Sequence, residues 1–94
     1  MKIEFDLAKS ARNAKERGLS FELVADLDWD AAHTIEDQRQ SSGETRYLVY
    51  AAMQGRLHVV CFCIRGGAFR IISFRKANKR EEKFYAEEKA SLDR

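Results

Sequence analysis

The feature that most constrains the fold of this chain is a set of three runs rich in β-branched and aromatic residues, separated by turns that contain glycine. The runs cover residues 45–53, 56–64 and 69–76. Gln54-Gly55 and residues 65–68 lie between them, and glycine readily adopts the positive φ that tight hairpin turns require. The pattern predicts three antiparallel strands joined as a meander.

The residues before the meander predict a short strand followed by a helix. Ile3 and Phe5 alternate with charged residues, as in a strand with one covered face. Asp6 is a typical helix cap, and Gly18 supplies the left-handed residue that often ends a helix. We expect the apolar face of this helix to consist of Leu7, Ala11 and Ala14.

A second short helix is predicted to begin after Ser20. Its cap would be the Ser20 side chain, and its apolar positions would be Phe21, Val24, Ala25 and Leu27. Residues 31–36 then indicate an irregular strand, and residues 37–43 a polar loop.

The carboxyl-terminal segment predicts a closing helix. Asn78 and Glu81 have the spacing of a capping box, so the helix is expected over residues 79–93. Its Phe84, Tyr85 and Leu92 would pack on the sheet. Helices gathered around one antiparallel sheet make an α+β fold, and 94 residues form a single domain over residues 1–94.

Basic and acidic side chains are unevenly distributed. Residues 1–40 contain six Lys/Arg and nine Asp/Glu, and residues 41–94 contain eleven Lys/Arg and six Asp/Glu. Solvated surfaces normally mix both signs, so the segment from Thr45 to Arg80, which has no acidic residue, indicates a surface that binds a polyanion. The alternative is an ordinary basic surface to which the first half of the chain supplies acids. The basic residues of this segment are Arg46, Arg56, Arg65, Arg70, Arg75, Lys76, Lys79 and Arg80.

Neither the cysteines nor the histidines form a motif for a metal or cofactor. Cys61 and Cys63 share a face of a predicted strand with core residues, which indicates packing, and His58 lies on the opposite face. A structural zinc site needs four ligands, and these cysteines and histidines do not share one face. Gly66-Gly67 joins two strands and opens no helix, so it does not match a phosphate-binding loop. We therefore expect no cofactor and no metal, and interpret His33 and His58 as structural.

The end of the third run is a candidate phosphate site. Regular alternation puts Phe69, Ile71, Ser73 and Arg75 on one side of the strand, and Arg70, Ile72, Phe74 and Lys76 on the other. Arg75 and Lys76 would then meet the amino end of the closing helix, which favours anions. A phosphate there would contact both side chains, the amides after Asn78 and Arg46. The alternative is that these basic residues pair with Glu81, Glu82 or Glu44.

Several motifs together carry a family resemblance. The most specific is Arg70-Ile71-Ile72-Ser73-Phe74-Arg75-Lys76-Ala77, and others are Arg17-Gly18-Leu19-Ser20-Phe21-Glu22, Asp37-x-Arg39, Gly43-Glu44-x-Arg46, Gly55-Arg56-Leu57 and Arg65-Gly66-Gly67. On these motifs the chain resembles the BrnT family of bacterial type II toxins, related in fold to the RelE ribonuclease toxins. Phe74 stands where the family usually has alanine.

The resemblance implies an endoribonuclease toxin that inhibits translation. It also implies neutralisation by a BrnA-like antitoxin, which is a ribbon-helix-helix protein. The toxin would contact operator DNA only through this antitoxin. The positions that match the family and have suitable chemistry are Glu44, Arg46, Arg65, Arg75 and Lys76. Arg56, Arg70, Lys79 and Arg80 are the additional candidates for binding RNA.

Cleavage of RNA without a metal needs a deprotonated 2′-hydroxyl, a stabilised phosphorane and a protonated 5′-oxygen. Arginines suit the second task. Glu44 is either a base or an ion-pair partner that orders Arg46. The alternative function is a non-catalytic module that binds RNA or a protein through the same basic sheet. With no apolar run of membrane-spanning length, the expected location is the cytoplasm.

Overall fold

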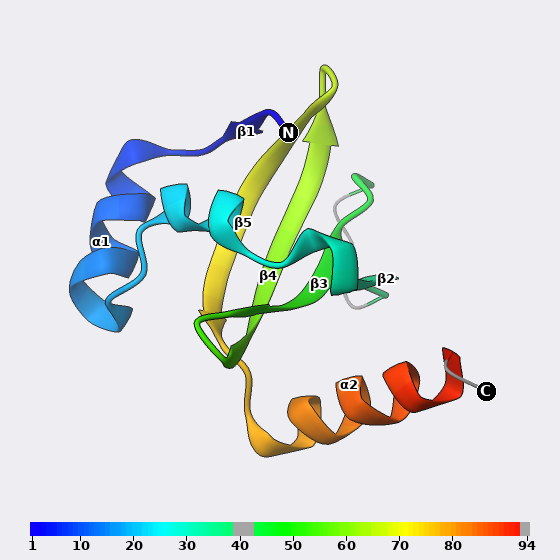
Figure 1. Cartoon of the computed structure of the whole chain (residues 1–94). Coiled ribbons are helices and arrows are strands. Elements are labelled where there is room, and N and C mark those ends of the chain that lie inside the picture. The colour runs from blue at the N-terminus through cyan, green and yellow to red at the C-terminus, as the bar shows by residue number, and fades with distance from the viewer. Residues whose placement is uncertain (39–42, 93–94) are drawn as a thin grey trace.

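A computed structural model describes residues 1–38 and 43–92 of the chain. Its centre is a five-stranded sheet in the order β1-β5-β4-β3-β2 (Figure 1). β1 pairs with β5 in parallel, and the other neighbours are antiparallel. In chain order the elements are β1 (Ile3–Glu4), α1 (Leu7–Arg17), the 3₁₀ helices η1 (Phe21–Asp26) and η2 (Trp29–Ala31), β2 (His33–Glu36), β3 (Tyr47–Met53), β4 (Arg56–Arg65), β5 (Ala68–Lys76) and α2 (Lys79–Leu92).

The α+β class and the meander are as predicted. Gln54 and Gly55 make the first tight turn with φ of 52° and 75°, and Gly66 and Gly67 make the second with φ of 55° and 80°. Two successive residues with positive φ form the turn whose twist matches that of the flanking strands. Local sequence therefore decides where the long strands begin and end.

Helix α1 has the predicted ends but a different buried face. The Asp6 side chain accepts a hydrogen bond from the Lys9 backbone N–H, and Gly18 ends the helix with φ of 72°. However, Leu7 is 77% exposed. The helix is held instead by Asn13, whose Nδ2 donates to the carbonyls of Leu19 and Phe74 at 2.7 and 2.9 Å. Polar contacts thus fix α1 beside the edge of β5.

The second predicted helix is the 3₁₀ helix η1. The Ser20 side chain makes no capping hydrogen bond, contrary to the prediction; the Leu23 N–H donates to the Ser20 carbonyl instead, and the buried Ser10 hydroxyl accepts the Phe21 N–H at 2.8 Å. Phe21 and Val24 are buried as expected, whereas Ala25 is exposed. The predicted irregular strand is β2, and residues 39–42 of the predicted loop lie outside the described residues.

The sheet is covered by a different layer on each face. On one face, which we call the η face, Phe21 and Val24 pack on strand residues that include Phe74. Figure 1 shows η1 beside β5, the segment after it crossing in front of β4, and η2 beside β3. On the other face, which we call the α2 face, Phe84 and Tyr85 of α2 pack on a smaller cluster of buried residues. The η face therefore holds the main core.

The β4–β5 ladder contains a bulge that contradicts the regular alternation predicted for β5. The register shifts between Cys61 and Phe62, so that Cys61 faces Ser73 while Phe62 faces Ile71. Ile71 and Phe74 consequently share the η face, since both belong to its core cluster. Arg70, Ser73 and Arg75 come to the α2 face, and Lys76 comes to the η face beside His58.

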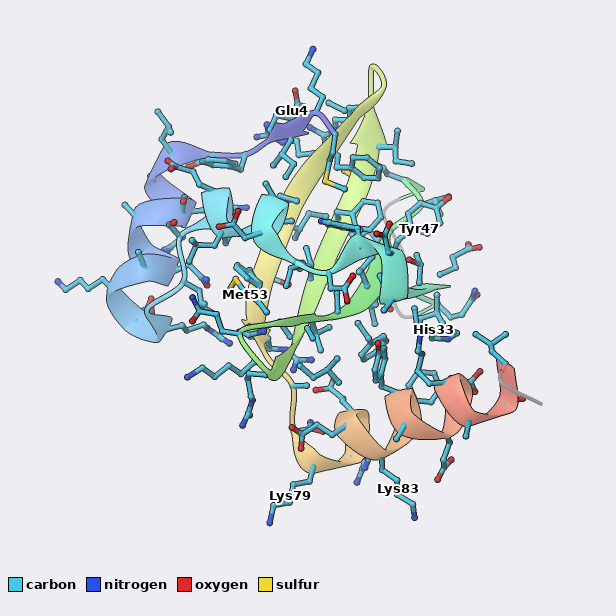
Figure 2. All side chains as sticks on the ribbon, viewed as in Figure 1. Glu4, His33, Tyr47, Met53, Lys79 and Lys83 are labelled. Atoms are coloured by element: carbon cyan, nitrogen blue, oxygen red, sulfur yellow. The ribbon has the colours of Figure 1, made fainter. Side chains whose placement is uncertain are left out.

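Helix α2 begins as predicted, with reciprocal capping bonds between Asn78 and Glu81 of 3.0 and 2.8 Å. The Tyr85 hydroxyl donates to the Ala31 carbonyl at 2.7 Å. Leu92 was predicted to pack on the sheet, but it is 73% exposed. In Figure 2, Lys79 and Lys83 project from α2 away from the sheet. None of the helices in the described ranges has the length and apolar character that crossing a membrane requires.

Candidate functional site

Three arginines gather on the half of the α2 face that lies toward β1. Arg46 precedes β3, Arg65 ends β4 and Arg70 lies near the start of β5. Together with Glu44 and Cys63 they line a cavity of about 200 Å³. We call Arg46, Arg65 and Arg70 the arginine cluster.

Glu44 holds Arg65 through two hydrogen bonds. Arg65 Nε and Nη2 donate to the two carboxylate oxygens at 2.9 and 3.0 Å. These bonds hold the pKa of Glu44 below its usual range, with smaller contributions from Cys63 and Arg46. A carboxylate with a low pKa and both oxygens occupied is a weak proton acceptor. Of the two roles open to Glu44, the geometry therefore favours ordering an arginine, although the arginine it binds is Arg65.

The floor of the cluster includes a buried thiol. Cys63 is 1% exposed, and burial together with Glu44 raises the pKa of its thiol. Both cysteines are free and buried, as the core interpretation predicted. Arg46 Nε is buried, and no hydrogen-bond partner for it lies within residues 1–38 and 43–92. Arg70 lies 3.9 Å from the Glu4 carboxylate.

The predicted phosphate site at the amino end of α2 is not assembled. Arg75 Nη1 and Nη2 donate to the Glu81 carboxylate at 2.7 and 2.8 Å, which is the alternative pairing. Lys76 points to the η face because of the bulge. Arg46 lies toward the opposite end of the sheet from Arg75, since Tyr47 pairs with Phe62 whereas Arg75 pairs with Val59.

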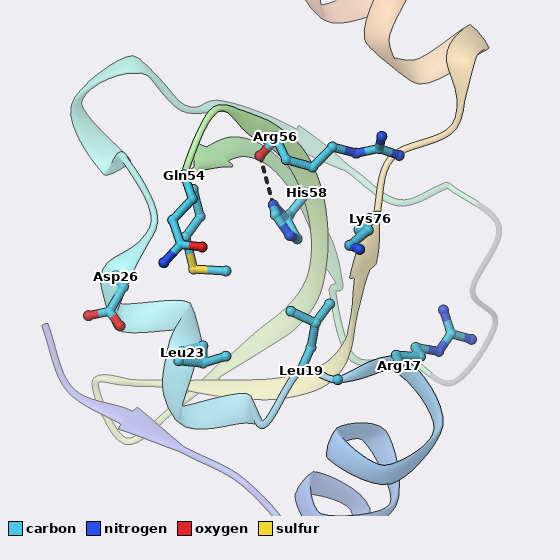
Figure 3. A pocket seen from close by; sticks show the side chains of 10 residues that line it. Arg17, Leu19, Leu23, Asp26, Gln54, Arg56, His58 and Lys76 are labelled. Carbon is cyan, nitrogen blue, oxygen red and sulfur yellow. Dashed lines mark hydrogen bonds between the residues drawn. The ribbon is translucent and has the colours of Figure 1, made fainter.

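A larger cavity of about 760 Å³ opens on the η face (Figure 3). Three basic residues line it: Arg17 from α1, Arg56 from the start of β4 and Lys76 from the end of β5. Arg56 also donates from Nη2 to the Ala77 backbone carbonyl at 2.9 Å. Of the additional RNA-binding candidates, Lys79 and Arg80 lie exposed at the start of α2.

His58, which the sequence analysis interpreted as structural, lines this second cavity and is 2% exposed. Its Nδ1 is 2.8 Å from the Arg56 carbonyl oxygen, which can only accept, so Nδ1 carries the proton. Burial lowers the pKa of His58, and Lys76 and Arg56 lower it further. The imidazole is therefore neutral, with Nε2 as its acceptor. Alternation of His58 with Val60 and Phe62 gave no sign of the cavity, because Arg17 and Lys76 come from distant segments.

Comparison with known proteins shows the family to which the chain belongs. The family model described as the ribonuclease toxin BrnT of type II toxin-antitoxin systems matches residues 5–81. The chain belongs to the BrnT family. No curated protein matches the chain in a sequence search. The matched range includes strands β2 to β5 and the capping box of α2, so both cavities of this BrnT-family toxin lie on the part of the chain that the family model matches.

Membership of the BrnT family confirms the resemblance seen in the sequence. It identifies the chain as a ribonuclease toxin of a type II toxin-antitoxin system, with RNA as its substrate and an antitoxin protein as its partner. Arg39, one of the residues that carried the resemblance, lies outside the described residues.

Proposed function

We propose that this toxin cleaves RNA at the arginine cluster on the open half of the α2 face. The observation that carries the proposal is the convergence of Arg46, Arg65 and Arg70 around one cavity, although they are distant in sequence. Arginine binds phosphate oxygens through paired N–H groups and stays charged at all physiological pH values. A phosphodiester over the cavity would thus meet several fixed donors.

The proposed reaction is attack by the 2′-oxygen of one nucleotide on its own 3′-phosphorus. The 2′-hydroxyl passes its proton to solvent water as the new P–O bond forms, and the bond to the 5′-oxygen of the next nucleotide breaks as that oxygen takes up a proton from solvent water. The products are a 2′,3′-cyclic phosphate and a 5′-hydroxyl. Extra negative charge develops on the phosphorane oxygens, and fixed arginines stabilise that charge more than they stabilise the ground state.

Glu44 is a positioning residue in this proposal. It fixes the guanidinium of Arg65 by two hydrogen bonds and leaves Arg65 Nη1 outside that pair. Arg65 therefore presents a donor whose direction is set before RNA arrives, which lowers the reorganisation needed during the reaction. Because the arginines supply the positive charge, we propose that the reaction needs no metal ion.

The biological part of the proposal follows from the family. The toxin inhibits translation in the cytoplasm by cutting RNA, and a BrnA-like ribbon-helix-helix antitoxin neutralises it. Operator DNA is bound only through that antitoxin. We propose that the antitoxin covers the arginine cluster, since acidic and aromatic side chains compete well with RNA for such a surface.

The experiment is cleavage of a fluorescent RNA by the purified toxin and its variants. Arg65→Ala and Arg70→Ala should each lower kcat by about 10²-fold or more, as expected for loss of one donor to developing charge. Lys83→Ala is the matched control, since Lys83 is basic and exposed but projects from α2 away from the sheet. Activity should survive EDTA. Unchanged cleavage by both arginine variants would refute the assignment of this site, and no cleavage by the wild type would favour a non-catalytic binding module.

A further inference from the structure

The arginine cluster and the cavity around His58 lie on opposite faces of the sheet, and two smaller cavities that share lining residues with them lie between. The first of these shares Lys9 and Ile72 with the arginine cluster's cavity and continues along α1 to Arg17. The next joins Arg17 to Arg75 and Lys76, and it opens on the His58 cavity through Arg17 and Lys76. We call this path between α1 and β5 the edge groove.

The edge groove exists because β1 is short. β1 pairs only with Phe69 and Arg70 of β5, so α1 and not a strand flanks the rest of that edge. Asn13 bonds the Phe74 carbonyl and holds α1 in place. From Lys9 to Arg17 the helix rises about 12 Å, at about 1.5 Å per residue.

The charge along the groove is strongly positive. Helix α1 contributes Lys9, Arg12 and Arg17 to the lining, and Glu16 is the acidic residue among the lining side chains there. Lys76 continues the positive charge at the end of β5, where Arg75 also lines the groove but has its charge paired with Glu81. A basic path of this kind suits the evenly spaced phosphates of a single nucleic acid strand.

The His58 cavity has two chemically different ends. In Figure 3, Arg17, Arg56 and Lys76 stand on one side, and Gln54 and Asp26 stand on the other. Leu19, Leu23 and Met53 supply apolar surface. Phosphate suits the basic side, while an amide and a carboxylate next to apolar surface suit the polar edge and flat faces of a nucleobase.

Gln54 adds a local observation that points the same way. It is the non-glycine residue with positive φ among residues 1–38 and 43–92, at 52°. The backbone there suits Gly or Asn better than Gln, and the hairpin turn that requires this angle holds residue 54 at a fixed place beside the cavity. At this position Gln54 lines the His58 cavity.

From these features we propose that single-stranded RNA runs along the edge groove from the arginine cluster and places one nucleotide in the His58 cavity. Its phosphate contacts Arg17 and Lys76, its base lies on Leu23 and Met53, and the base edge meets Gln54 and Asp26. His58 Nε2 is placed to accept a hydrogen bond from a ribose hydroxyl or a base amino group. The proposal rests on the proposed function, because it extends the RNA beyond the site of cleavage.

Binding of a 2′-O-methyl oligoribonucleotide tests the path, since this RNA lacks the 2′-hydroxyl needed for cleavage. Its affinity is measured by fluorescence anisotropy at several salt concentrations. Arg17→Glu should weaken binding about tenfold and reduce the slope of log K against log[salt] by roughly 0.7 or more. Lys15→Glu is the matched control, because Lys15 is exposed in the same last turn of α1 but lies outside the edge groove. Equal effects of the two variants would overturn the proposal.

Nuclear magnetic resonance of the same complex tests the cavity. The Gln54 side-chain amide and the His58 ring should shift on binding, with the dissociation constant that anisotropy gives. Gln54→Gly suits the positive φ and should keep the fold, yet weaken binding several-fold. RNA binding that leaves both signals unmoved would overturn the proposal.

A free nucleotide carries the same phosphate and base, and it is the alternative ligand for the His58 cavity. A 5′-nucleoside monophosphate should shift the Gln54 and His58 signals only at concentrations at least 100-fold higher than the oligonucleotide needs. Equal affinity for the monophosphate would make the cavity a site for free nucleotides and overturn the RNA path. These results do not depend on cleavage, so failure at the arginine cluster is recognised separately, from the kcat of Arg65→Ala and Arg70→Ala.

Discussion

Arg75 and Glu81 join the end of β5 to the first turn of α2 through two hydrogen bonds of 2.7 and 2.8 Å. The same Glu81 carboxylate accepts the Asn78 N–H of the capping box at 3.0 Å. One half-buried carboxylate therefore orders both the start of the helix and its attachment to the sheet. This pairing changes the expected role of Arg75 from binding phosphate to holding α2.

The first prediction concerns this pair. Arg75→Ala should lower the free energy of unfolding by about 1–3 kcal/mol, because it removes both hydrogen bonds that the Arg75 guanidinium donates to the half-buried Glu81 carboxylate. For a domain of this size that corresponds to a fall in Tm of roughly 4 °C or more in thermal unfolding followed by circular dichroism. Arg80→Ala is the control, since Arg80 is also a basic residue but is exposed in the first turn of α2. Equal Tm values for the two variants would contradict the prediction.

The second prediction concerns the buried cysteines. Cys61→Ala or Cys63→Ala should destabilise the toxin by about 1–2 kcal/mol through lost packing, while RNA cleavage is retained. Denaturant unfolding and the cleavage assay measure the two effects. Complete loss of cleavage in a folded Cys63→Ala variant would instead give the thiol a chemical role beside Arg65.

The third prediction is a pH dependence caused by His58. Burial lowers its pKa in the folded toxin, so between about pH 7 and pH 5 the unfolded chain takes up a proton that the folded chain resists. Stability from this group is present above the ordinary histidine pKa and is lost as the pH falls. His58→Leu fits the same apolar surroundings beside Phe74, and it should flatten the fall in urea midpoint between pH 7.5 and pH 5.5. A variant with the same pH profile as the wild type would show that His58 titrates normally.

The fourth prediction concerns the antitoxin. If it covers the arginine cluster, association should be fast at low salt and slow as ionic strength rises, because screening acts over about 8 Å at physiological salt. The double variant Arg46→Ala with Arg65→Ala should reduce both the association rate and its salt dependence in stopped-flow measurements. Affinity should fall less steeply with salt, since apolar contacts contribute much of it. A rate that is indifferent to salt in the wild type would place the antitoxin on another surface.

The sequence alone determined the parts of the fold that depend on neighbours along the chain. Asp6, Gly18 and the pair Asn78 and Glu81 set helix ends because a cap needs only a side chain or a backbone angle within one turn. Gly55, Gly66 and Gly67 fix the positions of the two hairpin turns, because glycine adopts positive φ without a steric cost whatever its tertiary surroundings. The family, too, was recognisable from short motifs.

Tertiary structure alone decided which charged side chains act together. The register shift between Cys61 and Phe62 breaks the two-residue period of β5. Simple alternation therefore placed Arg75 on the same face as Ile71, and Lys76 on the same face as Arg70, whereas the structure places each on the opposite face. Arg46, Arg65 and Arg70 meet because three strands bring distant segments together, and His58 joins a cavity because α1 lies beside β5. Electrostatic interactions depend on distance in space and on burial, neither of which local sequence specifies.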